Sequence, residues 1–210
     1  MKKIIWIASY PKSGNTYIRC FLSHYIYNNK SKFTFDLLKK IPKFESSEVF
    51  NRVFEKNSFS EDFTHLKLFL EAQEKLIKKF DQKELIFKTH HFFGQLNNHH
   101  FTQQKTTLLF VYLVRDPREV LISYARHSNM TINEMLNFFT SDKVIRKYKM
   151  ETIVNWSMHY KSWKSFKEVP SIFIKFEDLV KNPKIIFNSL IKFLSQYTNI
   201  QFDQKKIDET

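Results

Sequence analysis

Cysteine and glycine are nearly absent from this sequence of 210 residues. Cys20 is its one cysteine, so an intrachain disulfide and a cluster of thiolate metal ligands are both excluded. A single thiol is typical of proteins from a reducing compartment. Only two glycines occur, Gly14 and Gly94, so flexible backbone is scarce and the positions of these residues carry information.

Long apolar segments are absent as well. Residues 2–8 begin like a signal peptide, but the apolar run ends at Ser9, short of the roughly 7–15 residues of an apolar leader segment. No small-residue cleavage site follows, and no stretch reaches the ~18 consecutive apolar residues of a membrane span. The sequence therefore predicts a soluble protein, which we expect in the cytoplasm.

The composition is apolar enough for a packed core and strongly basic. Hydrophobic residues make up 42%, with 23 phenylalanines, so global disorder is excluded and one domain fits the length. The formal net charge of +13 favours anionic partners. The lysines are spread along the chain, so the charge indicates either a solvated basic surface or a nucleic-acid or membrane footprint.

Hydrophobic periodicity predicts strands that alternate with helices. Helices are expected over residues 15–28, over 33–80 with breaks near Pro42 and Asn57, and from Asn182 to Leu194. Two more helices are expected to begin at the caps Asp116 and Thr131. A further helical stripe consists of Ile153, Trp156, Tyr160 and Trp163. Strands are expected over residues 3–9, 84–88, 106–114 and 171–176. This pattern predicts an α/β fold in which helices flank a mainly parallel sheet, with residues 1–210 forming a single domain.

The first candidate site follows the first strand, in the sequence Tyr-Pro-Lys-Ser-Gly-Asn-Thr-Tyr at residues 10–17. Gly14 lets the backbone turn tightly and approach an anion without a Cβ in the way. The N-terminus of the next helix presents free N–H groups, to which Lys12, Ser13, Asn15 and Thr16 add donors. Lys12 precedes the glycine, so the spacing differs from that of a nucleotide-kinase phosphate loop.

Two further candidate sites follow later strands. Arg115 ends the third strand, and Ser123 comes eight residues later, inside the helix that Asp116 caps and in which Glu119 is placed to close a capping box. An arginine fork suits a dianionic phosphate, although Arg115 can instead pair with Glu119 or Asp116. Lys88-Thr89-His90 ends the second strand, at the sheet edge where parallel sheets bind ligands.

Histidine in this place suits a general base, because neutral imidazole accepts a proton near pH 7. A metal site is the alternative, since His91, His99 and His100 lie nearby in the sequence. No cysteine or neighbouring carboxylate completes a ligand set, so we expect no metal.

Together these motifs resemble sulfotransferases that use 3′-phosphoadenosine 5′-phosphosulfate (PAPS) and release 3′-phosphoadenosine 5′-phosphate (PAP). The likeness is collinear over residues 4–194 and includes Phe-Glu-Asp-Leu at residues 176–179. It implies a P-loop NTPase-like three-layer sandwich. It also implies that Lys12 contacts the oxygen between phosphate and sulfuryl group, and that the loop of Ser13, Gly14, Asn15 and Thr16 holds the 5′-phosphate.

The remaining roles implied by the resemblance fall on the other motifs. Tyr17 stands where the family most often has a tryptophan stacked on adenine. Arg115 and Ser123 bind the 3′-phosphate, Lys88 contacts the sulfuryl oxygens, and His90 removes the proton of the acceptor hydroxyl. Family members usually continue past the last helix, with an aromatic residue and an Arg-Lys-Gly contact for PAP, so we expect this domain to lack that segment.

The sequence thus predicts a PAPS-dependent transferase that acts on a small-molecule or glycan hydroxyl or amine. A phenol, lipid, sugar or peptide acceptor would each fit. A nucleotide-kinase-type phosphotransferase is one alternative, although a Walker-type lysine is missing. A non-catalytic basic module that binds nucleic acid or a sulfated polymer is the other, and it is motivated by the net charge alone.

Overall fold

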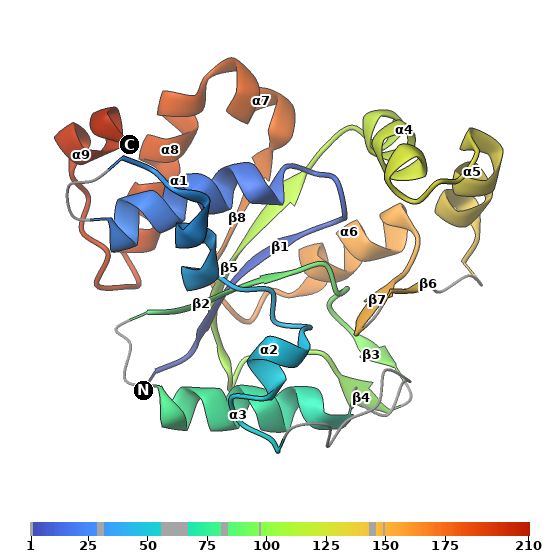
Figure 1. Ribbon diagram of the computed structural model, residues 1–210, viewed down its shortest axis with the longest axis horizontal. Helices are drawn as coiled ribbons and strands as arrows, with labels where there is room; N and C mark the ends of the chain where they lie inside the picture. The colour runs from blue at the N-terminus through green and yellow to red at the C-terminus, as the bar shows by residue number, and fades with distance from the viewer. Residues whose placement is uncertain are drawn as a thin grey trace.

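Four parallel strands form the centre of the computed structural model (Figure 1), which describes residues 2–28, 32–55, 67–80, 84–96, 98–142, 146–148 and 150–210. The strands are β1 (Ile4–Ser9), β2 (Leu85–Thr89), β5 (Thr107–Val114) and β8 (Ser171–Lys175). They pair in the order β2-β1-β5-β8, and β1 lies between β2 and β5 with Ile5 opposite Ile86 and Leu109. The predicted parallel sheet is confirmed.

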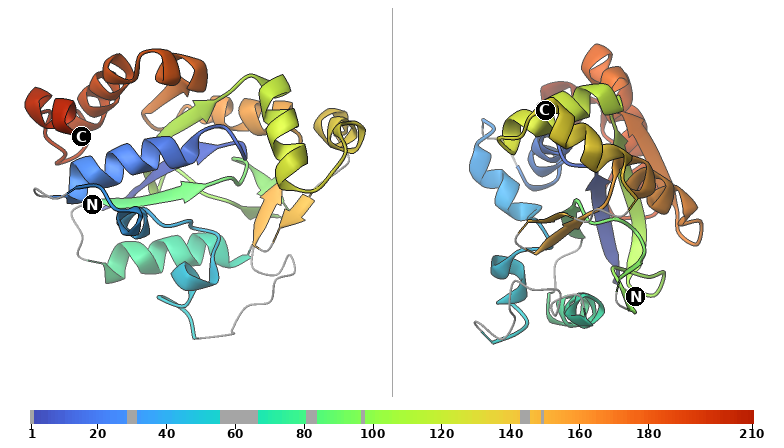
Figure 2. Two further views of the ribbon diagram at one scale, coloured as in Figure 1. Left: turned by 45° about the horizontal axis from the view of Figure 1, so that its top comes forward. Right: turned by 90° about the vertical axis from the view of Figure 1, so that its right-hand side faces the viewer.

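Alternating side chains of β1 supply two separate cores, one on each face of the sheet. Ile5 and Ile7 pack against α1 (Asn15–Tyr27), α7 (Phe176–Lys181), α8 (Pro183–Ser195) and α9 (Gln204–Glu209). Ile4 and Trp6 pack on the other face, against α2 (Ser47–Phe50), α3 (Phe69–Lys79) and α6 (Trp156–Ser165). The helices therefore form two outer layers around the sheet (Figure 2), as predicted for a three-layer sandwich.

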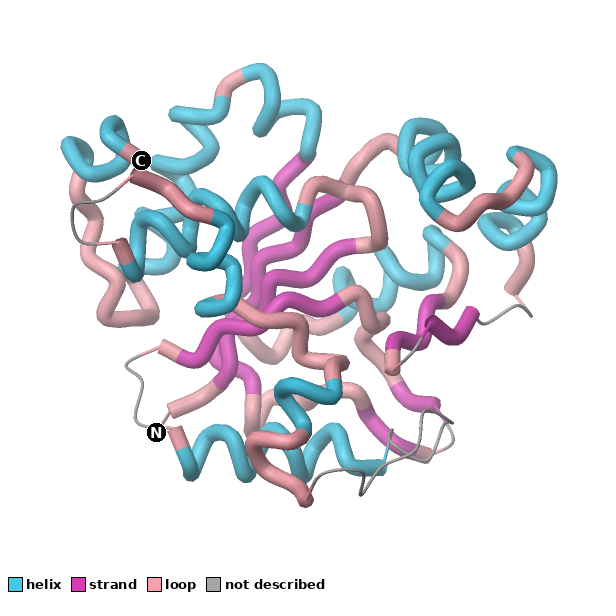
Figure 3. The backbone as a smooth tube through the Cα atoms, in the orientation of Figure 1, coloured by secondary structure: helices cyan, strands magenta, loops and turns pink. Residues whose placement is uncertain are grey.

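A third apolar cluster lies where the strands end. Helices α4 (Pro117–His127) and α5 (Ile132–Thr140) pack there around Tyr10, with Val120, Met135 and Phe138 buried. Two small antiparallel sheets lie outside the main one (Figure 3): β3 (Gln95–Leu96) with β4 (His99–His100), and β6 (Arg146–Tyr148) with β7 (Glu151–Ile153). Over the described ranges, none of the helices is both long and apolar enough to cross a bilayer.

The helical region expected over residues 33–80 is confirmed in part, as is its break near Pro42. Residues Phe35–Lys40 form a 3-10 helix (η1), and α2 and α3 are the α-helices found there. At the break, Pro42 and Lys43 run extended beside β2, because Lys88 N donates to Pro42 O (2.9 Å) and Phe44 N donates to Lys88 O (2.9 Å). The expected break at Asn57 falls outside the described residues. The short helix α9 was not predicted.

Helix starts were predicted with mixed success. The capping box of Thr131 and Glu134 at α5 is confirmed. Asp116 caps α4 as expected, but the capping box with Glu119 is wrong, because Glu177 of α7 accepts the Asp116 N–H at 2.9 Å. The stripe beginning at Ile153 is also wrong in part, since Ile153 lies in β7 and α6 begins at Trp156.

Candidate active site

A cavity of about 770 Å³ opens at the carboxyl ends of the four strands. Parallel sheets bind ligands at this edge, because the loops that follow the strands converge there. Residues from all the predicted motifs line it: Pro11, Lys12, Gly14, Asn15, Thr16, Lys88, His90, Arg115 and Ser123. Phe176 after β8 lines it as well, so each strand of the sheet contributes.

The loop between β1 and α1 adopts an unusual backbone. Lys12 has φ 68° and Gly14 has φ 92°, in the left-handed region that favours glycine. A Cβ added to Gly14 would overlap Cδ2 of Phe176, so glycine is required here by both conformation and space. The cradle that results leaves the first N–H groups of α1 without intrahelical acceptors.

The polar side chains of this loop divide into two groups. Asn15 points into the protein, where its Nδ2 donates to Ile7 O (3.0 Å) and Ser9 Oγ (3.2 Å), so it braces the loop on β1. Ser13 Oγ is buried and has no hydrogen-bond partner among the described residues. An orphaned hydroxyl, open helix N–H groups and a glycine cradle together fit a bound phosphate.

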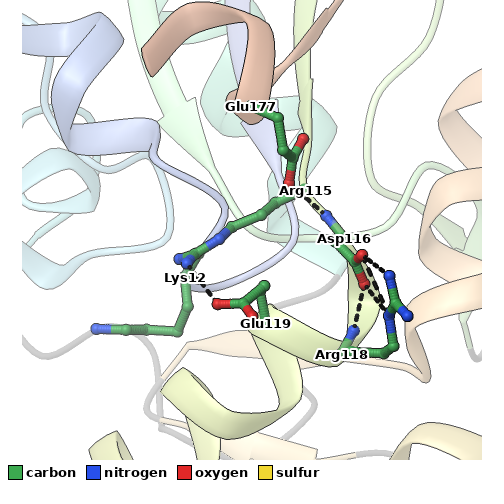
Figure 4. A network of polar contacts seen from close by, with 6 residues as sticks. All are labelled: Lys12, Arg115, Asp116, Arg118, Glu119 and Glu177. Atoms are coloured by element: carbon green, nitrogen blue, oxygen red, sulfur yellow. Dashed lines mark hydrogen bonds and ion pairs between the residues drawn. The ribbon is translucent and has the colours of Figure 1, made fainter. Parts of the chain in front are cut away.

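Arg115 is held at the edge of this loop (Figure 4). Its Nη1 donates to Lys12 O (3.2 Å), its Nη2 lies 3.4 Å from Glu119 Oε2, and its guanidinium carbon lies 4.7 Å above the Phe176 ring. The expected alternative partner Glu119 is therefore present, but at a long distance and largely exposed to solvent. Asp116 is engaged elsewhere, in an ion pair with Arg118.

His90 is buried next to the loop. Its Nδ1 lies 2.7 Å from the carbonyl oxygen of Ser9, which accepts only, so Nδ1 carries the proton. Nε2 is then the unprotonated nitrogen of a neutral ring. Burial and the nearby charge of Lys88 hold the pKa of His90 well below its ordinary value, which keeps the ring neutral at neutral pH.

Lys88 is partly buried two residues before His90. Burial lowers its pKa to about 8, although the charge of Glu151 opposes this effect. The protonated form therefore prevails at pH 7, and its charge is lost only one unit higher. The extended segment at Pro42 and Phe44 fixes the Lys88 backbone through the two hydrogen bonds described above.

Helix α6 fixes the backbone that carries His90. His159 is buried, with Nε2 3.0 Å from His90 O and Nδ1 2.8 Å from the Tyr112 hydroxyl. Its Nε2 must donate to the carbonyl, so the Tyr112 hydroxyl donates to Nδ1. Burial lowers the pKa of His159 to about 3, so this ring stays neutral. Trp163 Nε1 donates to His91 O at 2.9 Å and completes the restraint.

A buried carboxylate holds the same segment from the opposite side. Thr89 Oγ1 donates to Glu45 Oε1 and accepts from His91 N at 2.9 Å. Burial and the charge of Glu151 raise the pKa of Glu45 to about 7. Glu45 is thus a structural partner of the segment that carries Lys88 and His90.

We expect Glu45→Gln to make the protein more stable than the unchanged chain at pH 8. At pH 5 the gain in stability should be smaller. A carboxyl whose pKa is raised on folding contributes stability below its unfolded pKa of about 4.5, and this is lost as the pH rises through about 7. Glutamine keeps the acceptor for Thr89 without the buried charge. Thermal melting at both pH values measures the effect, at about 2–4 °C for each kcal/mol.

The exposed Glu48, which pairs with Arg52, provides the matched control. Glu48→Gln should shift the melting temperature little at either pH. Equal shifts for Glu45→Gln at pH 5 and pH 8 would contradict a titration of Glu45 in this range.

Three cavity residues were not among the predicted site residues. Lys43 reaches the cavity from the extended segment, Glu151 from β7, and Phe176 from the start of α7. Phe176 was foreseeable in position, because it directly follows β8 and strand ends converge. Lys43 and Glu151 meet through chain segments about 100 residues apart, and no periodicity or motif marks either residue.

Tyr17 does not line this cavity. It is 40% exposed and lies beside a second cavity of about 470 Å³, where it makes an edge contact with Phe187 at 5.8 Å. Cys20, Phe21 and Phe33 share that second cavity. The stacking of Tyr17 on adenine stays a prediction.

The four neighbouring histidines of the sequence do not converge on a metal. His99 and His100 are exposed in β4, whereas His90 and His91 are buried beside the main cavity. Throughout the described part of the chain, no group of three histidine, cysteine or acidic side chains is placed to hold a metal ion.

The family model of the sulfotransferase domain matches residues 2–209. A structure of a mouse sulfotransferase complexed with PAP is similar to 99% of the chain, with a TM-score of 0.59 and 17% identity. A retinol dehydratase in complex with retinol and PAP is similar to 100% of it, with a TM-score of 0.57 and 17% identity.

A second structure of retinol dehydratase, in complex with androsterone and inactive cofactor PAP, matches 98% of the chain with a TM-score of 0.57 and 15% identity. At these identities the likeness establishes the fold. The chain spans 62% of the length of the mouse protein, and 62% and 64% of the two retinol dehydratase chains.

Proposed function

Because the chain belongs to the sulfotransferase domain family, we propose that it transfers a sulfuryl group from PAPS to a hydroxyl or amine of an acceptor. One observation carries the proposal: a glycine cradle with Lys12, a neutral buried His90 and the arginine fork of Arg115 all open into a single cavity. PAP is the product that remains.

The loop and Arg115 supply two places for phosphate. Ser13, Gly14, Asn15 and Thr16 are assigned to the 5′-phosphate: Gly14, Asn15 and Thr16 line the cavity, and the buried Ser13 hydroxyl lies just behind this lining with no other described hydrogen-bond partner. Arg115 and Ser123 lie on the same cavity and are assigned to the 3′-phosphate. Tyr17 remains our proposed contact for adenine.

The transfer itself requires one base and two cations. The acceptor oxygen forms a bond to sulfur, its proton passes to Nε2 of His90, and the bond between sulfur and the bridging oxygen breaks. Lys12 stabilises the negative charge that develops on the bridging oxygen, and Lys88 faces the sulfuryl oxygens. Positioning and charge stabilisation carry most of the catalysis, as in phosphoryl transfer. No metal ion is assigned a role.

We expect kcat/KM for PAPS to be level near pH 7 and to fall above about pH 8. The reason is that Lys88 must be protonated, its pKa is lowered to about 8, and its charge is lost as the pH rises through that value. His90 contributes no change between pH 7 and 9, because its pKa lies well below 6.5. Initial rates between pH 6 and 10 at constant ionic strength measure the profile.

Lys88→Arg gives the control for this profile. Arginine stays protonated over the whole range, so the fall near pH 8 should disappear even if the rate at pH 7 drops. If kcat/KM of the variant still falls near pH 8, the group that titrates there is not Lys88.

Transfer of radioactive sulfur from PAPS to a panel of acceptors tests the proposal. Formation of labelled product together with PAP, without added metal, is the expected result. The cytoplasm remains the proposed location, in line with the single thiol of the chain.

A further inference from the structure

The cavity has a second end, away from the phosphate loop. We call it the acceptor end and define it by Lys43, Ser128, Asn129, Glu151 and Ile153. Ser128 and Asn129 follow the last turn of α4, about 16 Å along the helix from the end near Arg115. Figure 2 shows the hairpin of β6 and β7, which carries Glu151, near the same end of α4.

An ion pair dominates this acceptor end. Lys43 Nζ lies 3.0 Å from Glu151 Oε1, and the two side chains are 24% and 6% exposed. Beyond this ion pair, Glu151 Oε1 makes no hydrogen bond to the described residues. Both charges therefore lie close to Lys88, and Glu151 keeps lone pairs that can accept hydrogen bonds from a ligand.

Packing alone does not account for this pair. Apolar side chains of similar volume are often as stabilising as a buried ion pair, or more so, because they avoid the desolvation of two charges. Ile153 is the one aliphatic side chain of the acceptor end as defined, and Tyr124 and His127 from the last turn of α4 line the cavity beside it. Neighbouring Ser128 and Asn129 add donors and acceptors, so the wall is suited to a ligand that hydrogen-bonds.

The chemistry of the pair selects among acceptor classes. An ammonium offers donors and a carboxylate offers acceptors, so a hydroxyl that both accepts and donates fits between them. A cationic amine meets two lysines, Lys43 and Lys88, and is disfavoured. An aromatic alcohol would cover the pair without hydrogen bonds, and a site built for them rejects such a ligand by factors up to about 10⁴–10⁵.

On the basis of the proposed function, we propose that the acceptor is a polyhydroxylated compound, a sugar or sugar-like polyol. One hydroxyl lies at Nε2 of His90 and receives the sulfuryl group. A neighbouring hydroxyl donates to Glu151 and accepts from Lys43. The pair thus sets specificity, and Asn129 and Ser128 contact further hydroxyls of the same molecule.

Competition between defined acceptors tests this inference. Labelled PAPS is supplied with methyl glucoside, methyl galactoside or chitotriose, and separately with 2-naphthol or octylamine. We expect kcat/KM for at least one sugar to exceed that for 2-naphthol and octylamine by a hundredfold or more. A preference for 2-naphthol or octylamine over every sugar would overturn the inference.

The double variant Lys43→Met/Glu151→Leu separates specificity from structure. It should lower transfer to the preferred sugar at least a hundredfold, and raise transfer to 2-naphthol relative to that sugar. A parallel fall for both acceptors would assign the pair a structural role and overturn the inference. Lys105→Met/Glu74→Leu removes an exposed ion pair of 3.1 Å and should leave the ratio within about twofold.

Titration with PAP distinguishes the failure of this inference from that of the proposed function. If PAP binds but no sugar receives the sulfuryl group, the polyol assignment is wrong and the proposed donor site is still supported. If PAP does not bind, the proposed function falls, and the acceptor assignment falls with it.

Discussion

Replacing Lys12 with alanine should lower kcat for sulfuryl transfer by about 10²–10³, and replacing His90 with alanine by about 10²–10⁴. Lys12 belongs to the loop cradle, and no carboxylate of the described residues lies within ion-pair distance of its Nζ, so its charge is available to the leaving oxygen. His90 holds its proton on Nδ1 and leaves Nε2 to accept another. Single-turnover rates with saturating PAPS measure both losses.

The fold should survive both substitutions. Lys12 is partly exposed, and the His90 carbonyl stays bonded to His159 when the ring is removed. Lys39→Ala, which removes an exposed lysine paired with Asp36, is the matched control and should leave kcat unchanged. Full turnover in the Lys12 and His90 variants would refute the catalytic assignment.

Replacing Gly14 with alanine should weaken PAP binding by at least tenfold and also lower the melting temperature. Two effects combine: alanine is strained at φ 92°, and its Cβ would overlap the Phe176 ring. Displacement of Phe176 would also disturb Arg115, whose guanidinium lies 4.7 Å from that ring. Calorimetric titration with PAP and thermal melting measure the two consequences.

A second substitution divides the two effects. Phe176→Ala in the Gly14→Ala background removes the overlapping Cδ2 but not the backbone strain, so it should restore part of the PAP affinity. The non-catalytic binding module predicts instead that Gly14→Ala changes nothing. PAP affinity equal to that of the unchanged chain in Gly14→Ala would contradict the cradle.

The parts of the site that the sequence predicted are those with local causes. The strand, loop and helix around Gly14 follow from a buried strand, a glycine and an amphipathic helix. Arg115 and His90 lie beside that loop because parallel strands end at one edge of the sheet. The same rule places Phe176, although its contact with Gly14 could not be predicted from the local pattern.

The parts that escaped prediction depend on distant partners. Glu119 had the spacing of a capping box, but Glu177 takes the Asp116 N–H from another helix. Lys43 was expected only to lie near a helix break. Its backbone forms a parallel β-bridge with Lys88 of β2. Glu45 and Glu151 are ordinary carboxylates in the sequence, and only burial beside one another gives Glu45 its raised pKa.

A comparison of PAP with adenosine 5′-monophosphate (AMP) tests most directly the proposal that one cavity holds both phosphates of PAP. Calorimetric titration of both ligands without metal should show PAP binding at least tenfold more tightly, because Arg115 and Ser123, which line the cavity, are the proposed contacts of the 3′-phosphate that AMP lacks. Arg115→Ala should remove most of that difference. Equal affinity for PAP and AMP, or binding of adenosine triphosphate with magnesium in place of PAP, would contradict it.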